Sequence, residues 1–486
     1  MVYIHRDVED GAFMQWYNSN KNCVGFKKAL VVYGARQVGK TTTIKHFANE
    51  HFQNVYYFNL KENDFAFDTL KDAVYRDNYD FMYNLMQVLT NNQYIDSINS
   101  VIIFDETQSL PKVYGHLRLF TRILNSYVIL TGSYLGMHAF KPGFIPAGDI
   151  HNIHMTGFTF KEFLRITGYD YYIDVINENL KLMQCFSYED HTKLFDIFNI
   201  YMKTGGYPSV VLDYVNDFND DILSSDLNDL INLFCDESME YLENIDDKII
   251  LKDVLYHIPK VILKRENVTS KVSKVTELIN ETDKLHNKIT SRDVRNIISW
   301  LIETHMFTQS YRCADLEFNF FSGEGRIYLK DTGLSRYLLG NTDTATGIIT
   351  EGYILTVLEN IISINRGKTP ERVLFVESPG LEVDFYAHTT YGKTAIEVKT
   401  GSNMKNKGSV DLLKNKKIDF IIRTGMSNLG REGNILTVPL YAFSFLDLRI
   451  SDDVRLGFDK IDSDFMKEFK EKQKNNYYIK PMKFFE

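Results

Sequence analysis

Residues 31–42, VVYGARQVGKTT, constrain the fold of this chain more than any other segment. The spacing is Gly-x-x-x-x-Gly-Lys-Thr, with β-favouring residues before it and a helical pattern after it. In this context glycines let the backbone fold around phosphate oxygens, at the amino end of a helix whose partial positive charge favours anions. The segment therefore predicts a phosphate-binding loop between a strand and a helix of an α/β sheet.

Each part of this loop has an expected role. The backbone N–H groups would surround the phosphates, Lys40 would reach the β- and γ-phosphates, and the Thr41 hydroxyl would hold Mg²⁺. ATP and Mg²⁺ are therefore the expected cofactors. The predicted nucleotide-binding residues are Gly34, Ala35, Arg36, Gln37, Val38, Gly39, Lys40, Thr41 and Thr42.

Two further strands are predicted to end beside the loop. Residues 101–104 form an apolar run typical of a buried parallel strand, and Asp105 and Glu106 follow it. Since α/β sheets bind ligands at the carboxyl ends of their strands, Asp105 is predicted to hold Mg²⁺ and Glu106 to polarise the attacking water. After the strand at 127–130, Thr131 or Ser133 could sense the γ-phosphate. The predicted catalytic residues are Lys40, Glu106, Thr131 and Ser133, and the predicted metal ligands are Thr41 and Asp105.

Composition limits the remaining classes of protein. A hydrophobic content of 44% and a charged content of 24% fit a globular protein, and 486 residues suggest about two to four domains. The net charge of −9 excludes a surface that is basic overall, so nucleic acid would need local patches. The cysteines are widely spaced, the N-terminus lacks an apolar leader, and no apolar run reaches about 18 residues. We expect a cytoplasmic protein with no membrane segment.

Several segments together carry a family resemblance: GARQVGKTT, FDETQSLP, LTGSYL, GFTFKEFL at 157–164 and TGGYPSVV at 204–211. With them the chain resembles a prokaryotic family of AAA-type P-loop ATPases in which a domain of uncharacterised function follows the ATPase. That family usually has Ala-Gly-Arg where this chain has Ala147-Gly148-Asp149. If the arginine helps to neutralise charge, Arg118, Arg122 or a neighbouring subunit of an oligomer must replace it.

The middle of the chain shows helical periodicity. Residues 170–265 predict a helical connector, and 288–307 predict a helix with an apolar stripe opposite Arg292 and Arg295. With strands at 308–312 and 325–329, this segment resembles a winged helix, whose second helix can enter the DNA major groove. Arg292 and Arg295 are therefore candidate contacts to DNA, RNA not being excluded. Helix packing or protein contact is the competing interpretation.

Alternating strands near the C-terminus carry paired charges. Glu382 and Asp384 share one face of the strand at 381–386, and Glu397 and Lys399 share one face of the strand at 394–400. With Glu351 on a preceding helix, this constellation resembles the PD-(D/E)xK nuclease fold. The resemblance implies that Asp384 and Glu397 hold Mg²⁺, that Lys399 acts on the attacking water and that Glu351 completes the metal shell, with Glu359 as a weaker substitute.

The expected architecture is α/β and has several domains. These are a P-loop ATPase domain of the AAA type at 1–165, a helical connector at 166–267, a winged-helix-like domain at 268–340, a restriction-endonuclease-like domain at 341–450 and a tail at 451–486. The leading hypothesis is an ATP-hydrolysing protein that acts on or near nucleic acid. The alternative is a nucleotide-dependent binding switch whose inactive nuclease-like domain recognises a protein partner.

Overall fold

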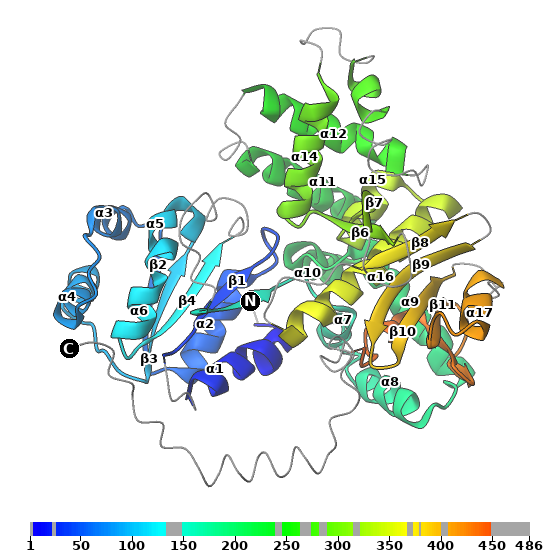
Figure 1. Ribbon diagram of the computed structural model, residues 1–486, viewed down its shortest axis with the longest axis horizontal. Helices are drawn as coiled ribbons and strands as arrows, with labels where there is room; N and C mark the ends of the chain where they lie inside the picture. Colours follow the sequence, from blue (N-terminus) through cyan, green and yellow to red (C-terminus); the bar gives the residue numbers. More distant parts are fainter. Residues whose placement is uncertain are drawn as a thin grey trace.

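The computed structural model describes residues 3–21, 26–132, 148–238, 245–262, 274–280, 289–313, 321–366, 373–378, 381–399 and 407–448. Ser133 and the predicted tail at 451–486 lie outside these residues. A five-stranded sheet forms one side of the molecule and an eight-stranded sheet the other, with helices between and above them (Figure 1). None of the described helices is both long enough and apolar enough to span a bilayer.

The first sheet consists of parallel strands in the order β2-β3-β4-β1-β5. Every residue of β3 and β4 is buried, as expected of strands covered by helices on both faces. The predicted strands at 101–104 and 127–130 are thereby confirmed. The strands are β1 (Ala29–Tyr33), β2 (Asn54–Asn59), β3 (Ser100–Asp105), β4 (Tyr127–Gly132) and β5 (Ile150–His154).

Helices cover both faces of this sheet because its apolar side chains alternate. Val101 and Ile103 point to the face covered by η1, α1 and α2, and Ile102 and Phe104 to the face covered by α3 to α6. The helices are η1 (Glu9–Phe13), α1 (Met14–Lys21), α2 (Lys40–His51), α3 (Asp64–Asp72), α4 (Tyr79–Leu89), η2 (Thr107–Ser109), α5 (Pro111–Gly115) and α6 (Leu117–Ile123).

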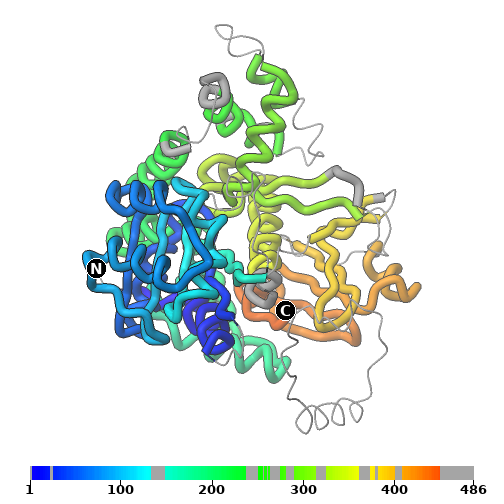
Figure 2. Tube along the Cα trace, turned by 60° about the vertical axis from the view of Figure 1, so that its left-hand side comes forward, coloured from blue at the N-terminus to red at the C-terminus, as the bar shows by residue number. Residues whose placement is uncertain are grey.

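The middle of the chain is helical, as its periodicity predicts. Figures 1 and 2 show α12 and α14 at the top of the molecule, beyond both sheets. Phe234 of α11 packs on Trp300 of α14, and Phe198 of α9 packs on Tyr353 of α16 (Asp343–Arg366), so these helices share one core with the C-terminal part. The helices are α7 (Phe160–Ile166), α8 (Tyr171–Leu182), α9 (Tyr188–Thr204), α10 (Pro208–Asp217), α11 (Asp220–Ser238), α12 (Ile245–Ile262) and α14 (Ser291–Glu303).

The second sheet runs in the order β12-β13-β11-β10-β9-β8-β6-β7. Its strands are β6 (Phe307–Cys313), β7 (Phe321–Leu329), β8 (Leu374–Ser378), β9 (Leu381–Thr389), β10 (Gly392–Val398), β11 (Phe420–Gly425), β12 (Gly430–Glu432) and β13 (Ile435–Pro439). The accompanying helices are α15 (Thr332–Leu339), α16 (Asp343–Arg366), α17 (Lys407–Lys414) and α18 (Leu440–Phe443).

The predicted wing belongs to this second sheet. Strand β6 pairs with β7 on one side and, through Tyr311 and Arg312, with β8 on the other. The hairpin thus satisfies backbone groups of β8 that would otherwise form an exposed edge. The domain boundary predicted at 340 therefore divides one continuous sheet. It was placed there because local sequence patterns do not record strand pairing between distant segments.

Candidate nucleotide site and C-terminal carboxylate cluster

The predicted phosphate loop connects β1 to α2, and its backbone explains two glycines. Gly39 has a φ of 91° and precedes α2, a conformation that glycine adopts without strain. A Cβ atom on Gly34 would lie 2.0 Å from the carbonyl oxygen of Met155, so position 34 has no room for a side chain. Ala35, Arg36, Gln37 and Val38 form the loop between these glycines, and Thr42 is exposed in the first turn of α2.

Lys40 is buried beneath the loop. Its Nζ donates hydrogen bonds to the carbonyl oxygens of Gly34 at 3.0 Å and Ala35 at 2.7 Å. Burial lowers the pKa of Lys40 to about 8, although Glu106 and Asp105 act in the opposite direction. In this structure Lys40 Nζ donates to the two carbonyl oxygens, and the oxygens of a bound phosphate would accept the same hydrogen bonds. The position of Lys40 therefore fits the predicted role.

The predicted metal ligands touch each other. Thr41 Oγ1 donates a hydrogen bond of 2.7 Å to Asp105 Oδ2, although the two residues are 64 positions apart. The Tyr57 hydroxyl donates to the same oxygen at 2.8 Å, and the Asp105 side chain is buried. A hydroxyl beside a buried carboxylate offers the oxygen ligands that Mg²⁺ prefers. Tyr57 was missed by the sequence reasoning, since nothing in its neighbours distinguishes it.

Glu106 adopts a strained backbone conformation at the end of β3. Its φ of 51° lies in the left-handed region, which non-glycine residues rarely occupy outside turns and functional sites. The Gln108 side chain donates a hydrogen bond to its carboxylate. The strain turns the chain sharply after Asp105, so that both acids lie at the carboxyl edge of the sheet, near enough to Lys40 to act on its pKa.

Thr131 lies in β4, the strand between β1, which leads into the phosphate loop, and β3, which ends at Asp105. In β4 it pairs with Val32 of β1, and its carbonyl oxygen accepts from the Thr107 hydroxyl at 3.1 Å. Its Oγ1 is buried and has no hydrogen-bond partner within the described part of the chain. A buried hydroxyl without a partner is costly unless a bound group satisfies it, so Thr131 fits the predicted nucleotide site.

Arg6 is a site residue that the sequence reasoning missed. Its buried guanidinium donates to Val38 O of the loop at 3.0 Å, to Thr156 O at 2.8 Å and to Gly157 O at 3.0 Å. It also pairs with Glu162 Oε1 at 2.9 Å. Arg6 therefore connects the N-terminal segment to the loop and to the start of α7. A lone arginine near a chain start carries no sequence signal for such a role.

The surroundings of Asp149, which stands where the family has an arginine, correct the expectation that Arg122 replaces that arginine. Arg122 donates to Asp149 Oδ1 through Nε at 2.9 Å and Nη2 at 2.6 Å. The Asp149 carbonyl accepts from Ala29 N, so this pair lies at the amino end of β1, one strand length from the phosphate loop. Arg122 is therefore not a replacement for the missing arginine. Arg118 is exposed on α6, and its role stays a prediction, as does that of a neighbouring subunit.

Two glycine-containing turns lie against each other. The Asp331 carboxylate accepts from Gly206 N at 2.8 Å and from Leu334 N at 2.9 Å, which caps α15. A Cβ on Gly205 would lie 2.2 Å from Asp331 Oδ1, and one on Gly333 would lie 2.3 Å from the Thr204 carbonyl oxygen. The end of α9 is thus fitted against the start of α15 at backbone contact. Gly205 and Gly333 are the sequence signal that could have indicated this close contact.

A cavity of about 210 Å³ separates the phosphate loop from the C-terminal part. Ala35 of the loop lines it together with His154, His305 and Lys330. The two imidazole rings lie 4.4 Å apart, and burial holds the pKa of each well below its usual value, so both are neutral. Lys330 pairs with Glu359 at 2.9 Å, and the role of Glu359 as a substitute for Glu351 stays a prediction.

The C-terminal acids predicted from sequence come together. Ile396 pairs with Phe385, and one further step of the same register sets Glu397 opposite Asp384 on adjacent strands. Lys399 Nζ lies 3.3 Å from Glu397 Oε2 and 3.9 Å from Asp384 Oδ2. Burial raises the pKa of Asp384, against the opposing effects of Lys399 and a hydrogen bond from Val398 N.

Glu351 joins this cluster through residues that the sequence reasoning missed. The buried Tyr328 hydroxyl donates to Glu351 Oε2 at 3.0 Å, and Asp384 is close enough to act on the Tyr328 pKa. The buried Arg326 pairs with Glu382 at 3.0 Å and also influences the pKa of Asp384. Both come from β7, a strand that the predicted domain boundary separated from the cluster.

Arg292 and Arg295 lie on the exposed side of α14. The predicted apolar stripe opposite them is confirmed, since Val294, Ile297 and Leu301 are buried. A capping box between Thr290 and Asp293 starts the helix. The two arginines are therefore accessible, and their contact with nucleic acid stays a prediction.

Comparison with known proteins finds two family models. An AAA domain matches residues 26–164, and a domain of unknown function (DUF8612) matches residues 196–345. The second match crosses the boundaries predicted at 267 and 340, and it ends before the strands that carry Asp384 and Glu397. It therefore provides no support for a nuclease fold. No curated protein matches the sequence.

Solved structures show weaker likenesses. The Walker-type ATPase paby2304 of Pyrococcus abyssi is 13% identical over 69% of this chain and 96% of its own, with a TM-score of 0.39. The ORC2 protein of Aeropyrum pernix is 13% identical over 72% and 94%, with a TM-score of 0.37. The RuvB Holliday junction branch migration motor of Thermotoga maritima is 11% identical over 64% and 90%, with a TM-score of 0.27. The AAA domain match and the geometry of the loop agree, and together they support an AAA-type domain with a phosphate-binding loop in the N-terminal part of this chain.

Proposed function

We propose that the chain binds ATP with Mg²⁺, hydrolyses it, and transmits its nucleotide state to a C-terminal region that acts on nucleic acid. The observation that supports the ATPase part best is the 2.7 Å hydrogen bond from Thr41 Oγ1 to Asp105 Oδ2, above the buried Lys40. These two residues would hold Mg²⁺, which would neutralise charge on the phosphates.

The remaining residues of the site would divide the other tasks. Lys40 would exchange its two loop carbonyls for phosphate oxygens and keep a positive charge there. Glu106, oriented by Gln108, would orient and polarise the attacking water, and the Thr131 hydroxyl would contact the γ-phosphate. Ser133 is the alternative to Thr131 and lies outside the described residues.

Two contacts give the nucleotide site a physical route to the C-terminal region. The loop lines the same cavity as His305 and Lys330, so a shift of the loop changes the surroundings of the C-terminal residues. Asp331 holds Gly206 at the end of α9, which ties α15 to the helices that follow the ATPase sheet. Such packed contacts have few alternative arrangements, which favours switching between discrete states.

The C-terminal cluster supports a metal-dependent action on phosphodiesters. Asp384 and Glu397 are set side by side on paired strands with Lys399 beside them. In this proposal the two acids hold Mg²⁺, Glu351 completes the metal shell, and Lys399 orients the attacking water. Arg292 and Arg295 would contact the phosphate backbone of DNA or RNA from α14.

The ATPase part is tested with Lys40→Ala. Titration calorimetry with Mg²⁺ and ATP should show binding to the natural chain and none to this variant. Lys71→Ala is the matched control, because Lys71 is an exposed lysine at the end of α3 in the same domain. Unchanged affinity in Lys40→Ala would refute the site assignment.

The C-terminal part is tested by incubating supercoiled and linear DNA with Mg²⁺ or Mn²⁺, with and without ATP. Cleavage is expected in the natural chain and its loss in Asp384→Ala. Asp411→Ala, an exposed acid on α17, should cut normally. Mobility-shift assays on Arg292→Glu with Arg295→Glu should show lost DNA binding.

One observation favours the rival function, a nucleotide-dependent switch whose C-terminal region recognises a protein. The positive charges of Arg326 and Lys399 already offset the negative charges of the acidic cluster, and Glu397 is fully buried. Moreover, Glu351, Asp384 and Glu397, all within the described residues, do not bring three ligand atoms within 4.8 Å of one another. Absence of cleavage under every condition, with partner binding that depends on ATP, would select this function.

A further inference from the structure

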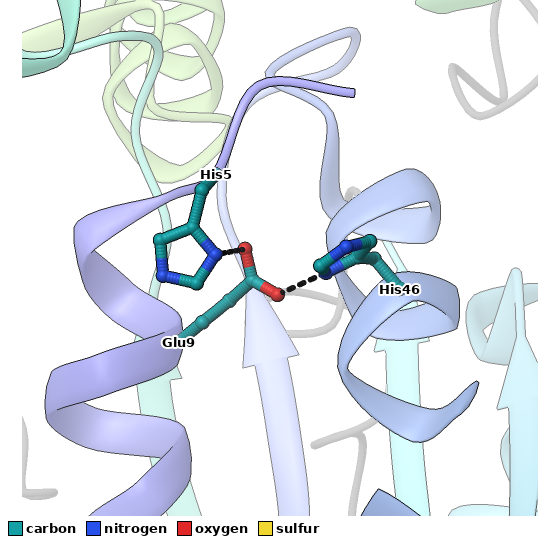
Figure 3. A group of neighbouring side chains, drawn as sticks. All are labelled: His5, Glu9 and His46. Atoms are coloured by element: carbon teal, nitrogen blue, oxygen red, sulfur yellow. Dashed lines mark hydrogen bonds and ion pairs between the residues drawn. The ribbon is translucent and has the colours of Figure 1, made fainter. Parts of the chain in front are cut away.

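A cluster of two histidines and a glutamate lies outside the nucleotide site. His5 and Glu9 come from the N-terminal segment and the start of η1, and His46 comes from α2, the helix that follows the phosphate loop (Figure 3). His46 Nδ1 lies 2.8 Å from Glu9 Oε2, and His5 Nδ1 lies 3.6 Å from Glu9 Oε1. One ligand atom from each residue can be chosen so that all three lie within 4.8 Å of one another.

We propose that His5, Glu9 and His46 bind one divalent transition-metal ion of the zinc class, which fastens the N-terminal segment to the phosphate-loop helix. Two imidazoles and one carboxylate are ligands that suit Zn²⁺, whereas Mg²⁺ and Ca²⁺ prefer oxygen alone. A tetrahedral zinc site with bonds of about 2.0–2.1 Å spaces its ligand atoms roughly 3.3 Å apart. Small rotations would bring the three side chains to that spacing.

The surroundings of both histidines support metal binding. His5 Nε2 lies 3.0 Å from Asp10 Oδ2, and His46 Nε2 lies 3.6 Å from Glu50 Oε1. Each imidazole thus turns one nitrogen towards Glu9 and the other towards a second carboxylate. Metal-bound histidines commonly donate their other N–H to a carboxylate, which fixes the tautomer that leaves a lone pair for the metal.

Glu9 is also held as a metal-binding carboxylate would be. Its side chain is 2% exposed, and its Oε1 accepts from the Tyr3 hydroxyl and, at 2.9 Å, from Arg6 N. Oε2 faces His46 and is the oxygen available to the ion. His5 is 42% exposed and His46 27% exposed, so an ion can reach the cluster from solvent, and a water would supply the fourth ligand.

The position of the cluster gives the ion a structural consequence. Arg6 follows His5 directly and contacts the phosphate loop at Val38 O. His46 lies on α2, which starts at Lys40. An ion held between Glu9 and His46 would therefore restrain both the Arg6 segment and the loop helix. Because no described nucleotide-site residue is a ligand, metal binding can be tested apart from ATP binding.

The test is calorimetric titration of the tag-free full chain, stripped of metal, with Zn²⁺ in the presence of millimolar Mg²⁺ to occupy oxygen-only sites. We expect one Zn²⁺ per chain and a higher midpoint of thermal denaturation. His46→Ala and His5→Ala should each lose this binding, and Glu50→Gln should weaken it about tenfold or more. His51→Asn, on the same helix but outside the cluster, should bind normally.

Cobalt(II) in place of zinc distinguishes this site from adventitious binding to cysteine. The visible spectrum of a four-coordinate site without thiolate bands is expected, and it should disappear in His5→Ala, whose exposed side chain can be removed without disturbing the core. Absence of Zn²⁺ binding in the natural chain would overturn the proposal. So would stoichiometric binding that survives in both histidine variants.

Discussion

Replacing Arg6 with methionine should loosen the phosphate loop, although Arg6 lies outside every recognisable motif. The guanidinium joins three backbone carbonyls and the Glu162 carboxylate, and the side chains of the pair are only 5% and 2% exposed. Methionine fills similar volume but donates no hydrogen bond. The variant therefore leaves a buried carboxylate without its cation.

The expected loss of stability depends on the hydrogen bonds that Glu162 keeps when Arg6 is replaced. Breaking one partner of a buried ion pair typically costs about 3–5 kcal/mol. Glu162 still accepts from Asp7 N at 2.9 Å and from Thr159 N at 2.7 Å, so the lower end, about 3 kcal/mol, is expected. Adding Glu162→Gln should recover a large part of this loss, since the unpaired charge is then gone.

Hydrogen exchange of the loop and of α7 is the suitable assay, because a chain with several domains need not unfold in one step. Protection at 34–44 and 157–166 should fall in Arg6→Met and partly return in the double variant. Arg165→Met is the control: its pair with Asp7 is partly exposed and should be worth less than about 1 kcal/mol. Protection in Arg6→Met equal to that of the control would refute the reasoning.

Three further outcomes are expected. Lys40→Met should stabilise the nucleotide-free chain by up to about 3 kcal/mol below pH 8, because burial lowers the Lys40 pKa to about 8 from 10.5. Denaturation experiments at increasing pH should show this gain in stability fading towards pH 10.5. A gain that stays constant with pH would contradict the prediction. Asp384→Asn should raise the denaturation temperature at neutral pH but not in acid, since burial raises the Asp384 pKa and the natural carboxyl is protonated there. Asp331→Ala should leave nucleotide affinity intact in calorimetry but abolish any nucleotide-dependent change in hydrogen exchange of α15, because Gly206 N loses its acceptor.

The nucleotide site shows how far local patterns reach. Thr41 and Asp105 were each predicted as a metal ligand from their motifs alone, and the hydroxyl and carboxylate are in contact. Parallel strands deliver their carboxyl ends to one edge, so two motifs that each follow a strand meet there whatever the intervening chain does. Tyr57 and Arg6 reach the same site by side-chain length and packing, which no local pattern records.

The C-terminal cluster was predicted less completely. Asp384 and Glu397 alternate on their strands as expected, because the pleat alone decides which side chains share a face. Arg326 and Tyr328 could not be assigned to the cluster, since β7 reaches it through the pairing of β6 with β8. The sequence also offered Arg122 as a replacement for an absent arginine, whereas Asp149 holds Arg122 at the opposite end of the sheet.

By itself the sequence determined a parallel sheet with a phosphate loop, the edge of that sheet where Asp105 and Glu106 lie, a helical middle and a charged C-terminal strand pair. These follow from spacing, periodicity and alternation, which act over a few residues. Only the tertiary structure decided that α9 meets α15 through Asp331, that the predicted wing completes the C-terminal sheet, and that His5 and Glu9 lie beside His46. Those contacts join residues distant in sequence, and they are selected by strand pairing and core packing of the whole chain.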